Sequence, residues 1–187
     1  MSQPTLTTSR LIVRPYQMED KPELIDLIGD PLVSKPLLIV PYPYTEKDAD
    51  EWINSRQVAF EAGESAQFVV TSKVSGVLLG GCGVIMIPKF NMAEIGYWVG
   101  RKFWGQGYTT EAARAVVDWA FDNFGLNRIY ARYDVNNPAS GRVMQKLGMQ
   151  SEGILRQHVL KDGVYCDMAY YGLLRSEWLK KVVNTTL

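Results

Sequence analysis

The sequence is poor in the residues that most often carry metal or covalent chemistry. Its 187 residues include one histidine, His158, and two cysteines, Cys82 and Cys166, which form no CxxC pair. Zinc sites need several such ligands at short spacings, so we expect no metal site. Two widely spaced cysteines favour reduced, buried thiols over a disulfide. No Ser-His-Asp or Cys-His set stands at a recognisable spacing, which argues against a covalent enzyme intermediate.

Net charge and long apolar runs are also absent. The 20 basic and 20 acidic residues cancel, so the chain lacks the broad basic field that nucleic-acid binders use to hold phosphates. No apolar run reaches the roughly 18 residues that predict a membrane span. The polar start, MSQPTLTTSR, has no apolar core of a secretion signal. We therefore expect a cytoplasmic protein with no nucleic-acid or membrane partner.

Apolar residues make up 47% of the chain, enough for a full core, and the length predicts a single domain over residues 1–187. Alternation, helical periodicity and turn residues predict the order strand, two helices, three strands, helix, strand, helix and a final hairpin. A short helix then ends the chain. Strands cluster first and alternate with helices later. This order predicts a mixed α/β (α+β) sheet of about seven strands, flanked by helices on both faces.

A proline-rich stretch, DPLVSKPLLIVPYPY, separates the first two predicted helices. Proline removes backbone donors, so we expect an irregular and partly apolar loop between Pro31 and Tyr44. Loops of this length inside a compact domain are often functional. The next helix is expected to begin after Thr45, an N-cap residue with Asp48 three positions on, and to end at Gly63.

The stretch GRKFWGQGYTTEA, from Gly100 to Ala112, joins a predicted strand to the clearest amphipathic helix of the chain. Glycines without a Cβ atom and free amides at a helix N-terminus favour an anion such as a phosphate. An ordinary glycine turn remains an equal alternative from these residues alone. The stretch lacks the GxxxxGK[ST] of a P-loop, and Thr110 stands where a Rossmann fingerprint needs its third glycine. Both of those interpretations fail.

Two sequence motifs, in this order along the chain, resemble those of a known family. AEIGYWVGRKFWGQGYTTEA, followed by VNNPASGRVMQKLGM, resembles the GNAT superfamily of acetyl-CoA-dependent N-acetyltransferases, and in particular its RimJ/RimL-like branch. The opening TSRLIVRPYQMEDKPEL and the closing GVYCDMAYYGLLRSEW resemble the same branch, so the resemblance covers nearly the whole chain. It implies a twisted mixed sheet that splays after the fourth strand, with acetyl-CoA as co-substrate and no metal.

The resemblance also implies which residues hold the cofactor. The loop that cradles the CoA diphosphate corresponds to the residues from Lys102 to Gly107, where Lys102 replaces the usual Gln or Arg. The exposed strand edge that pairs with the pantetheine arm corresponds to Tyr97, Trp98 and Val99. The full set of expected cofactor contacts is Tyr97, Trp98, Val99, Lys102, Gly105, Gln106, Gly107, Tyr108, Thr109, Asn137 and Arg142.

Acetyl transfer to an amine needs a base, since the attacking nitrogen must be neutral, and a proton donor for the departing thiolate. By resemblance, Glu94 is the candidate base, acting directly or through water; a surface acid or an arginine partner is the alternative. Met144 stands where many of these enzymes carry a tyrosine acid, so Ser140 is the candidate donor to the sulfur. His158 is expected to be structural or exposed.

Two functions stay open. The first is a direct-transfer N-acetyltransferase that acts on a primary amine, either a peptide or protein N-terminus or a small amine. The second is a non-catalytic CoA-binding sensor or assembly module with the same fold, which Met144 motivates. The proline-rich loop and the helix after it are expected to shape the acceptor pocket. The final hairpin and exposed aromatic residues leave a homodimer as an open alternative.

Overall fold

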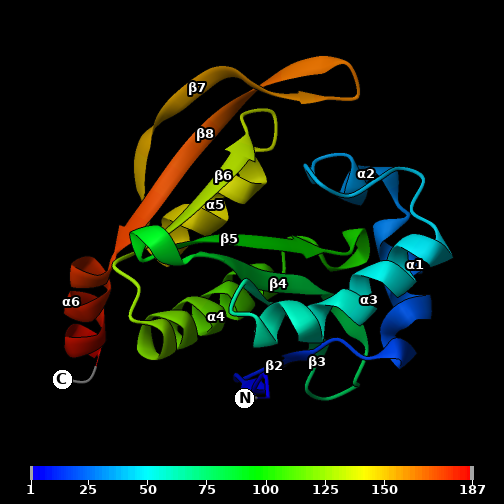
Figure 1. Cartoon of the computed structure of the whole chain (residues 1–187), viewed down its shortest axis with the longest axis horizontal. Coiled ribbons are helices and arrows are strands. Elements are labelled where there is room, and N and C mark those ends of the chain that lie inside the picture. The colour runs from blue at the N-terminus through cyan, green and yellow to red at the C-terminus, as the bar shows by residue number, and fades with distance from the viewer. Residues whose placement is uncertain (1, 186–187) are drawn as a thin grey trace. The chain divides into compact units, whose positions relative to one another are not determined.

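The structure is a computed structural model that describes residues 2–185 (Figure 1). Its described strands form one mixed sheet in the order β1-β2-β3-β4-β5-β6-β8-β7. The strands are β1 (Leu6–Thr7), β2 (Leu11–Pro15), β3 (Ser65–Ser72), β4 (Leu78–Ile87), β5 (Met92–Val99), β6 (Arg128–Asp134), β7 (Gln150–Lys161) and β8 (Val164–Leu174). The α-helices are α1 (Lys21–Ile28), α2 (Pro31–Ser34), α3 (Glu46–Glu61), α4 (Tyr108–Phe124), α5 (Pro138–Leu147) and α6 (Arg175–Thr185).

The mixed sheet with flanking helices confirms the predicted fold class, with two differences in detail. The first predicted strand is divided into β1 and β2 by a turn, in which the Thr8 amide donates to the Leu11 carbonyl and the Thr8 hydroxyl accepts from the Leu11 amide, both at 3.0 Å. The sheet therefore has eight strands. The proline-rich loop contains one helical turn, α2, because Asp30 caps it by accepting from the Leu32 amide at 2.9 Å.

The chain folds into two compact units. Unit 1 comprises residues 1–85 and 96–116, and unit 2 comprises residues 86–95 and 117–187. The chain passes from one unit to the other inside β4, β5 and α4, so neither unit is a continuous segment. Within the described residues, no helix is both long and apolar enough to cross a bilayer.

Unit 1 has a helix-covered sheet face. Leu24 and Leu27 of α1, Ala49 and Ile53 of α3, and Val69 of β3 form one buried cluster with Leu78. Because side chains alternate along a strand, Phe68 and Val70 point to the opposite face of β3, and both are buried. Thr45 caps α3 in a reciprocal box with Asp48, which confirms the predicted start of that helix.

Unit 2 contains the parallel part of the sheet. The parallel ladder of β5 and β6 covers Met92 to Glu94, and β6 then pairs antiparallel with β8 along its whole length. Strands β7 and β8 form the predicted long hairpin, whose turn residues Asp162 and Gly163 have φ values of 49° and 77°. This left-handed pair is the geometry that an Asp-Gly turn favours.

Cys82 and Cys166 form no disulfide with each other, and the reduced state expected for them stays a prediction. Cys82 is buried, with 3% of its surface exposed, and burial raises the pKa of its thiol. Cys166 on β8 is only half-buried. The expectation of burial is therefore right for Cys82 and wrong for Cys166, because most side chains in the outer part of the β7–β8 hairpin are exposed.

Candidate functional site

The glycine loop of unit 1 leaves its backbone accessible. Gly105 and Gly107 have φ values of 75° and 80°, a left-handed conformation that other residues adopt only with strain. A Cβ atom built on Gly105 would meet nothing within 4 Å, and one on Gly107 would meet only the Arg10 guanidinium at 3.6 Å. These two glycines are therefore required by backbone conformation and open the loop to an approaching ligand.

The amides of this loop are available as donors. Helix α4 begins at Tyr108, and the first amide with a backbone acceptor after the loop is that of Glu111, which donates to the Gly107 carbonyl at 3.1 Å. The amides from Gly105 to Thr110 have no hydrogen-bond acceptor within residues 2–185. A helix N-terminus carries a partial positive charge from its aligned peptide dipoles. The row of free amides therefore forms a site for an anion.

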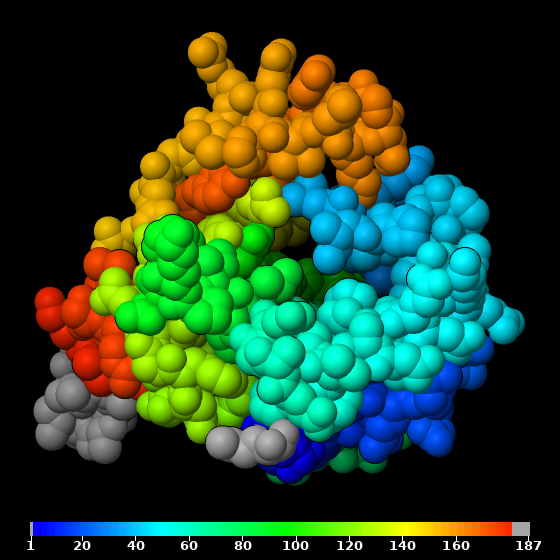
Figure 2. Space-filling model, viewed as in Figure 1, coloured from blue at the N-terminus to red at the C-terminus, as the bar shows by residue number. Residues whose placement is uncertain are grey.

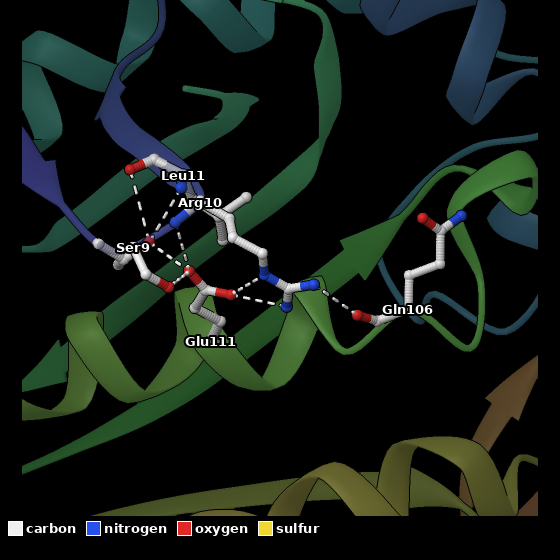
Figure 3. Close-up of polar contacts among 6 residues, drawn as sticks. Ser9, Arg10, Leu11, Gln106 and Glu111 are labelled. Carbon is white, nitrogen blue, oxygen red and sulfur yellow. Dashed lines mark hydrogen bonds and ion pairs between the residues drawn. The ribbon is translucent and has the colours of Figure 1, made fainter. Parts of the chain in front are cut away.

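Arg10 ties the N-terminal segment to this loop (Figure 3). Its guanidinium donates to both the Glu111 carboxylate, from Nε at 2.7 Å, and the Gln106 carbonyl, from Nη1 at 3.1 Å. It also lies over the ring of Tyr108, with 4.6 Å between Cζ and the ring centroid. One side chain thus contacts the loop at its middle and the helix in its first turn.

Glu111 is the centre of this network. Burial alone would raise the pKa of its carboxyl group, but hydrogen bonds from the Thr8 hydroxyl, the Arg10 amide and guanidinium, and the Ser9 hydroxyl lower that pKa to about 2. The donors lie 2.6 to 3.0 Å from the carboxylate oxygens. Glu111 is therefore ionised throughout the physiological range and holds residues 8–10 against α4.

Aromatic residues fix the other end of the loop. Phe103 packs against the buried cluster of α1 and α3, and the Trp104 indole donates to the Val99 carbonyl at 3.0 Å while 48% of its surface stays exposed. Two basic side chains of the loop make long, exposed ion pairs, Arg101 with Asp30 at 3.9 Å and Lys102 with Asp26 at 4.0 Å. Exposed pairs of this kind contribute little and break easily.

Trp98 stands between two cavities of unit 1. A slot of about 10 Å³ is lined by Gly80, Gly81, Tyr97, Trp98, Tyr108 and Thr109, among others. A Cβ atom on Gly80 would lie 2.2 Å from the Trp98 carbonyl, and one on Gly81 would lie 2.5 Å from the indole nitrogen. The two glycines of β4 therefore let β5 approach closely and seat the indole.

The second cavity has a volume of about 290 Å³. It lies between the segment 39–44 and helix α3, which Figure 2 shows in light blue and cyan at the surface. Its walls are Leu24, Ile28, Ile39, Val40, Pro41, Tyr44, Asp48, Glu51, Trp52, Ser55, Arg56 and Trp98. The proline-rich loop and the following helix thus enclose a pocket, as the sequence predicted for an acceptor pocket; that use of it stays a prediction.

Glu94 of unit 2 is engaged by two donors. Its Oε1 atom accepts from the Arg132 guanidinium at 2.8 Å and its Oε2 atom accepts from the Tyr130 hydroxyl at 3.0 Å. Burial and the neighbouring Glu94 charge raise the pKa of Tyr130 to about 12, so Tyr130 donates rather than titrates. Glu94 therefore has the arginine partner that the sequence left as an alternative, and its role as a base stays a prediction.

The segment before α5 also belongs to unit 2. Asn137 occupies the N-cap position of α5, but its side chain makes no capping hydrogen bond. Arg142 is exposed, and Ser140 is half-buried on the same helix. Met144 is 1% exposed and packs in the core, so this position offers no proton donor. His158 is exposed on β7 and lies edge-on to the Tyr170 ring, in agreement with its expected minor role.

The predicted site residues are divided between the two units. Unit 1 brings together the residues from Tyr97 to Val99 and from Lys102 to Thr109, while unit 2 holds Glu94, Asn137, Ser140 and Arg142. Sequence reasoning missed Arg10 as a contact of the loop and Arg56 as a wall of the larger cavity. The TSRL stretch contributes only to the family resemblance, and nothing in its spacing indicates Gln106 or Glu111 as partners of Arg10.

Comparison with known proteins defines the class to which this fold and loop belong. Residues 10–150 match the family "Acetyltransferase (GNAT) domain". The chain is 33% identical to an uncharacterized N-acetyltransferase, p20 of Bacillus licheniformis, over 93% of this chain and 98% of p20. A GNAT-family acetyltransferase from Bacillus anthracis superposes with a TM-score of 0.83 at 27% identity, covering 93% of this chain and all of the other.

The chain therefore belongs to the GNAT acetyltransferase family, and it is an acyltransferase of the N-acetyltransferase type. The structure of a RimL ribosomal-protein alpha-N-acetyltransferase in complex with coenzyme A shares the fold, with a TM-score of 0.81 at 19% identity over 93% of this chain and 99% of the other. The predicted GNAT family is confirmed, and RimJ/RimL-like proteins are among its relatives, such as the ribosomal protein uS5-alanine N-acetyltransferase of Escherichia coli, 30% identical over 48% of this chain and 46% of that protein.

Proposed function

We propose that this chain moves an acetyl group directly from acetyl-CoA to a primary amine, either a peptide or protein N-terminus or a small amine. The observation that carries this proposal is the row of free amides from Gly105 to Thr110 at the start of α4. It lies in the loop that matches the diphosphate loop of the family, and it needs no side-chain rearrangement to accept an anion.

The residues of unit 1 fit the cofactor in the following way. The diphosphate is held by the amides of Gly105 to Thr109, with Lys102 released from its weak pair with Asp26 to add charge. The pantetheine arm, which carries two amides, lies along Tyr97 and Trp98. The Val99 carbonyl already accepts from Trp104, so Val99 contributes as a wall of the slot.

When bound, acetyl-CoA supplies an activated thioester carbonyl. The amine nitrogen attacks that carbonyl, a C–N bond forms, the C–S bond breaks, and one proton leaves the nitrogen while one is gained by sulfur. We assign the first proton to Glu94 acting through a water, since each Glu94 oxygen keeps a lone pair beside those used by Arg132 and Tyr130. Ser140 donates a hydrogen bond to the departing sulfur. If Ser140 does not protonate the sulfur, solvent does, because thiolates are good leaving groups.

We assign the acceptor to the cavity of unit 1 enclosed by residues 39–44 and α3. Trp98 lines both this cavity and the slot beside the glycine loop. An amine seated in the cavity therefore lies against the strand along which the cofactor arm is expected. Aromatic and aliphatic walls with few polar groups are typical of pockets for small molecules and side chains.

An acceptor screen tests this function. Acetyl-CoA and the protein are mixed with peptides that begin with Ser, Ala or Met, with polyamines, amino sugars and amino acids, and thiol release is followed. For an accepted amine, Glu94→Gln is expected to lower kcat by about 100-fold or more at neutral pH, while the rise in Tm with acetyl-CoA is kept. Tyr130→Phe is the matched control, since it removes one donor and leaves the carboxylate; kcat should change less than tenfold.

The sensor alternative predicts a different result from the same screen. A non-catalytic module would show the rise in Tm with acetyl-CoA but no amine-dependent thiol release. No rise in Tm at saturating acetyl-CoA would contradict both alternatives.

Three further expectations stay predictions. Residues 1–187 are proposed as one domain because β4, β5 and α4 each contribute residues to both units. A homodimer through the β7–β8 hairpin is supported by its exposed apolar side chains, among them Ile154, Leu160, Val164 and Tyr165. A cytoplasmic location is the third. Sedimentation of the purified chain at several concentrations tests the homodimer.

A further inference from the structure

Arg56 lies in the wall of the larger cavity, on the second half of α3. Its guanidinium is stacked on the Trp52 ring, with 3.8 Å between Cζ and the ring centroid. Nε donates to the Trp52 carbonyl at 2.9 Å and Nη2 to the Ser55 hydroxyl at 2.6 Å. These local contacts hold the planar group in place on the cavity wall, and the Nη1 donors have no hydrogen-bond partner among the described residues.

No carboxylate within residues 2–185 pairs with Arg56. The two acids that line the same cavity have other partners: Asp48 accepts from the Thr45 amide at 2.8 Å, and Glu51 lies 3.7 Å from Lys47. Burial lowers the pKa of Arg56 from its ordinary value, but an arginine stays protonated in proteins. A half-buried cation without a counter-ion costs free energy, and a ligand that supplies the negative charge recovers it.

A neutral donor accompanies this cation. Tyr44 lines the same cavity, and Arg56 and Tyr44 are close enough to perturb each other electrostatically. Burial raises the pKa of Tyr44 to about 12, so its hydroxyl keeps its proton. A guanidinium with donors to spare and a protonated hydroxyl, both in a cavity with aromatic and aliphatic walls, are the donor types that suit a carboxylate attached to an apolar body.

We propose that Arg56 binds a carboxylate of the acetyl acceptor, so that the acceptor is a small primary amine with a carboxylate and an apolar side chain. This inference rests on the proposed function, because it says which chemical group of the acceptor the proposed acceptor cavity binds. The volume of about 290 Å³ suits a small molecule or a very short peptide. A polyamine would place further positive charge beside an uncompensated cation and is disfavoured.

Matched acceptors that differ only in the carboxylate test the proposal. Leucine and phenylalanine are compared with leucinamide and phenylalaninamide, and Ala-Phe is compared with Ala-Phe-amide. Thiol release gives kcat/KM for each, and the rise in Tm with each compound gives binding without turnover. The free amino acids and the dipeptide distinguish an α-carboxylate beside the amine from one placed a residue away.

Arg56→Gln removes the charge, and Arg56→Lys keeps it without the planar fork. The expected result is that the acid-to-amide ratio of kcat/KM falls about 10- to 100-fold in Arg56→Gln, mainly through KM, and is partly restored in Arg56→Lys. Comparing ratios between wild type and variant cancels the different basicities of the acid and amide nitrogens. Rises in Tm with acetyl-CoA check that each variant is folded.

The outcomes separate this proposal from the proposed function. Binding of the carboxylates that depends on Arg56 but gives no thiol release supports the carboxylate site and contradicts acetyl transfer to these amines. Thiol release with equal acid-to-amide ratios in wild type and Arg56→Gln overturns the role of Arg56 and leaves the acetyltransferase intact. Neither binding nor turnover of any carboxylate-bearing amine by the wild type also overturns the carboxylate site, without any need for a variant.

Discussion

The two motifs expected to hold the cofactor are built in different ways. The glycine loop of unit 1 is fixed by side chains distant in sequence: Arg10 contacts the Gln106 carbonyl and Glu111, and Phe103 packs on α1 and α3. The segment before α5 in unit 2 is fixed by its own backbone, since the Asn137 amide donates to the Asp134 carbonyl at 2.7 Å and the Ser140 amide to the Asn137 carbonyl at 3.1 Å.

This difference indicates how each motif is prepared for a ligand. The loop leaves a row of amides without acceptors among the described residues, and its geometry depends on tertiary contacts, so binding should be sensitive to residues far from the ligand. The α5 segment leaves a side chain uncommitted, that of Asn137, so its contribution should depend on that residue alone. Preorganised donors bind more tightly because less ordering is required on binding.

The largest effect is expected from a substitution that disrupts the glycine loop directly. Gly107→Glu forces a side chain into a left-handed conformation and places a carboxylate where the diphosphate is expected. Acetyl-CoA at about 100 times its Kd should raise the Tm of the wild type by roughly 5 to 10 °C, and this rise should vanish in the variant. Gly63→Glu is the matched control, because Gly63 has φ 70° and open space around it but lies just after α3 and outside the glycine loop; the rise should persist.

The next effect concerns the stability that the Arg10 network contributes. Glu111 has a pKa of about 2 when folded, against an ordinary value of 4.5, so its ionised form stabilises the folded state. That contribution is complete above about pH 4.5 and is lost as the pH falls toward 2. Glu111→Gln should cost about 2 kcal/mol at pH 7 and flatten the pH dependence between those limits. Urea unfolding at several pH values measures this; an unchanged slope would contradict it.

A smaller effect on CoA affinity shows whether Arg10 acts by positioning the glycine loop or only by its charge. Arg10→Gln should weaken CoA binding about 10-fold, since the loop loses its donor at Gln106, and Arg10→Lys should recover part of the affinity. Arg101→Gln, which removes an exposed pair with Asp30, should change the affinity less than twofold. Calorimetric titration with CoA gives all three values. Equal losses in the Arg10 and Arg101 variants would indicate general electrostatic attraction instead.

The smallest expected effect on CoA affinity comes from a substitution in the segment before α5. Asn137→Ala should weaken CoA binding about three- to tenfold and change stability by less than about 0.5 kcal/mol, because no capping bond is lost. Asn136→Ala is the opposite control: its side chain bonds the Asp134 carboxylate at 2.9 Å, so stability should fall while affinity is kept. If Asn137→Ala destabilises the chain without changing affinity, the side chain has a structural role only.

Local chemistry explains which features could be predicted from the sequence. The Thr45–Asp48 capping box depends on residues three positions apart and is found as expected, and the predicted final hairpin has an Asp162–Gly163 turn made by adjacent residues. Their free energies are set by short-range backbone geometry, which the order of residues specifies directly.

Contacts between distant segments could not be predicted in this way. Arg10 and Glu111 are 101 residues apart, and Glu94 and Arg132 are 38 apart. Many acids of the chain were equally plausible partners for either arginine. Only the strand register, which places Tyr130 opposite Glu94, and the packing of residues 8–10 on α4 select the pair. Arg56 could not be predicted for a different reason. It stands out because no carboxylate among the described residues pairs with it, and the sequence does not show which pairs fail to form.

The position of Trp98 has a consequence for how the two substrates affect each other's affinity. Its indole borders both the slot and the larger cavity, and the Tyr16 hydroxyl beside it lies close to the indole nitrogen. Any displacement of the ring by one substrate changes the wall met by the other, and such thermodynamic coupling is equal in both directions. The affinity for acetyl-CoA measured with the acceptor present should therefore differ from the affinity measured alone, and tryptophan fluorescence should report the difference.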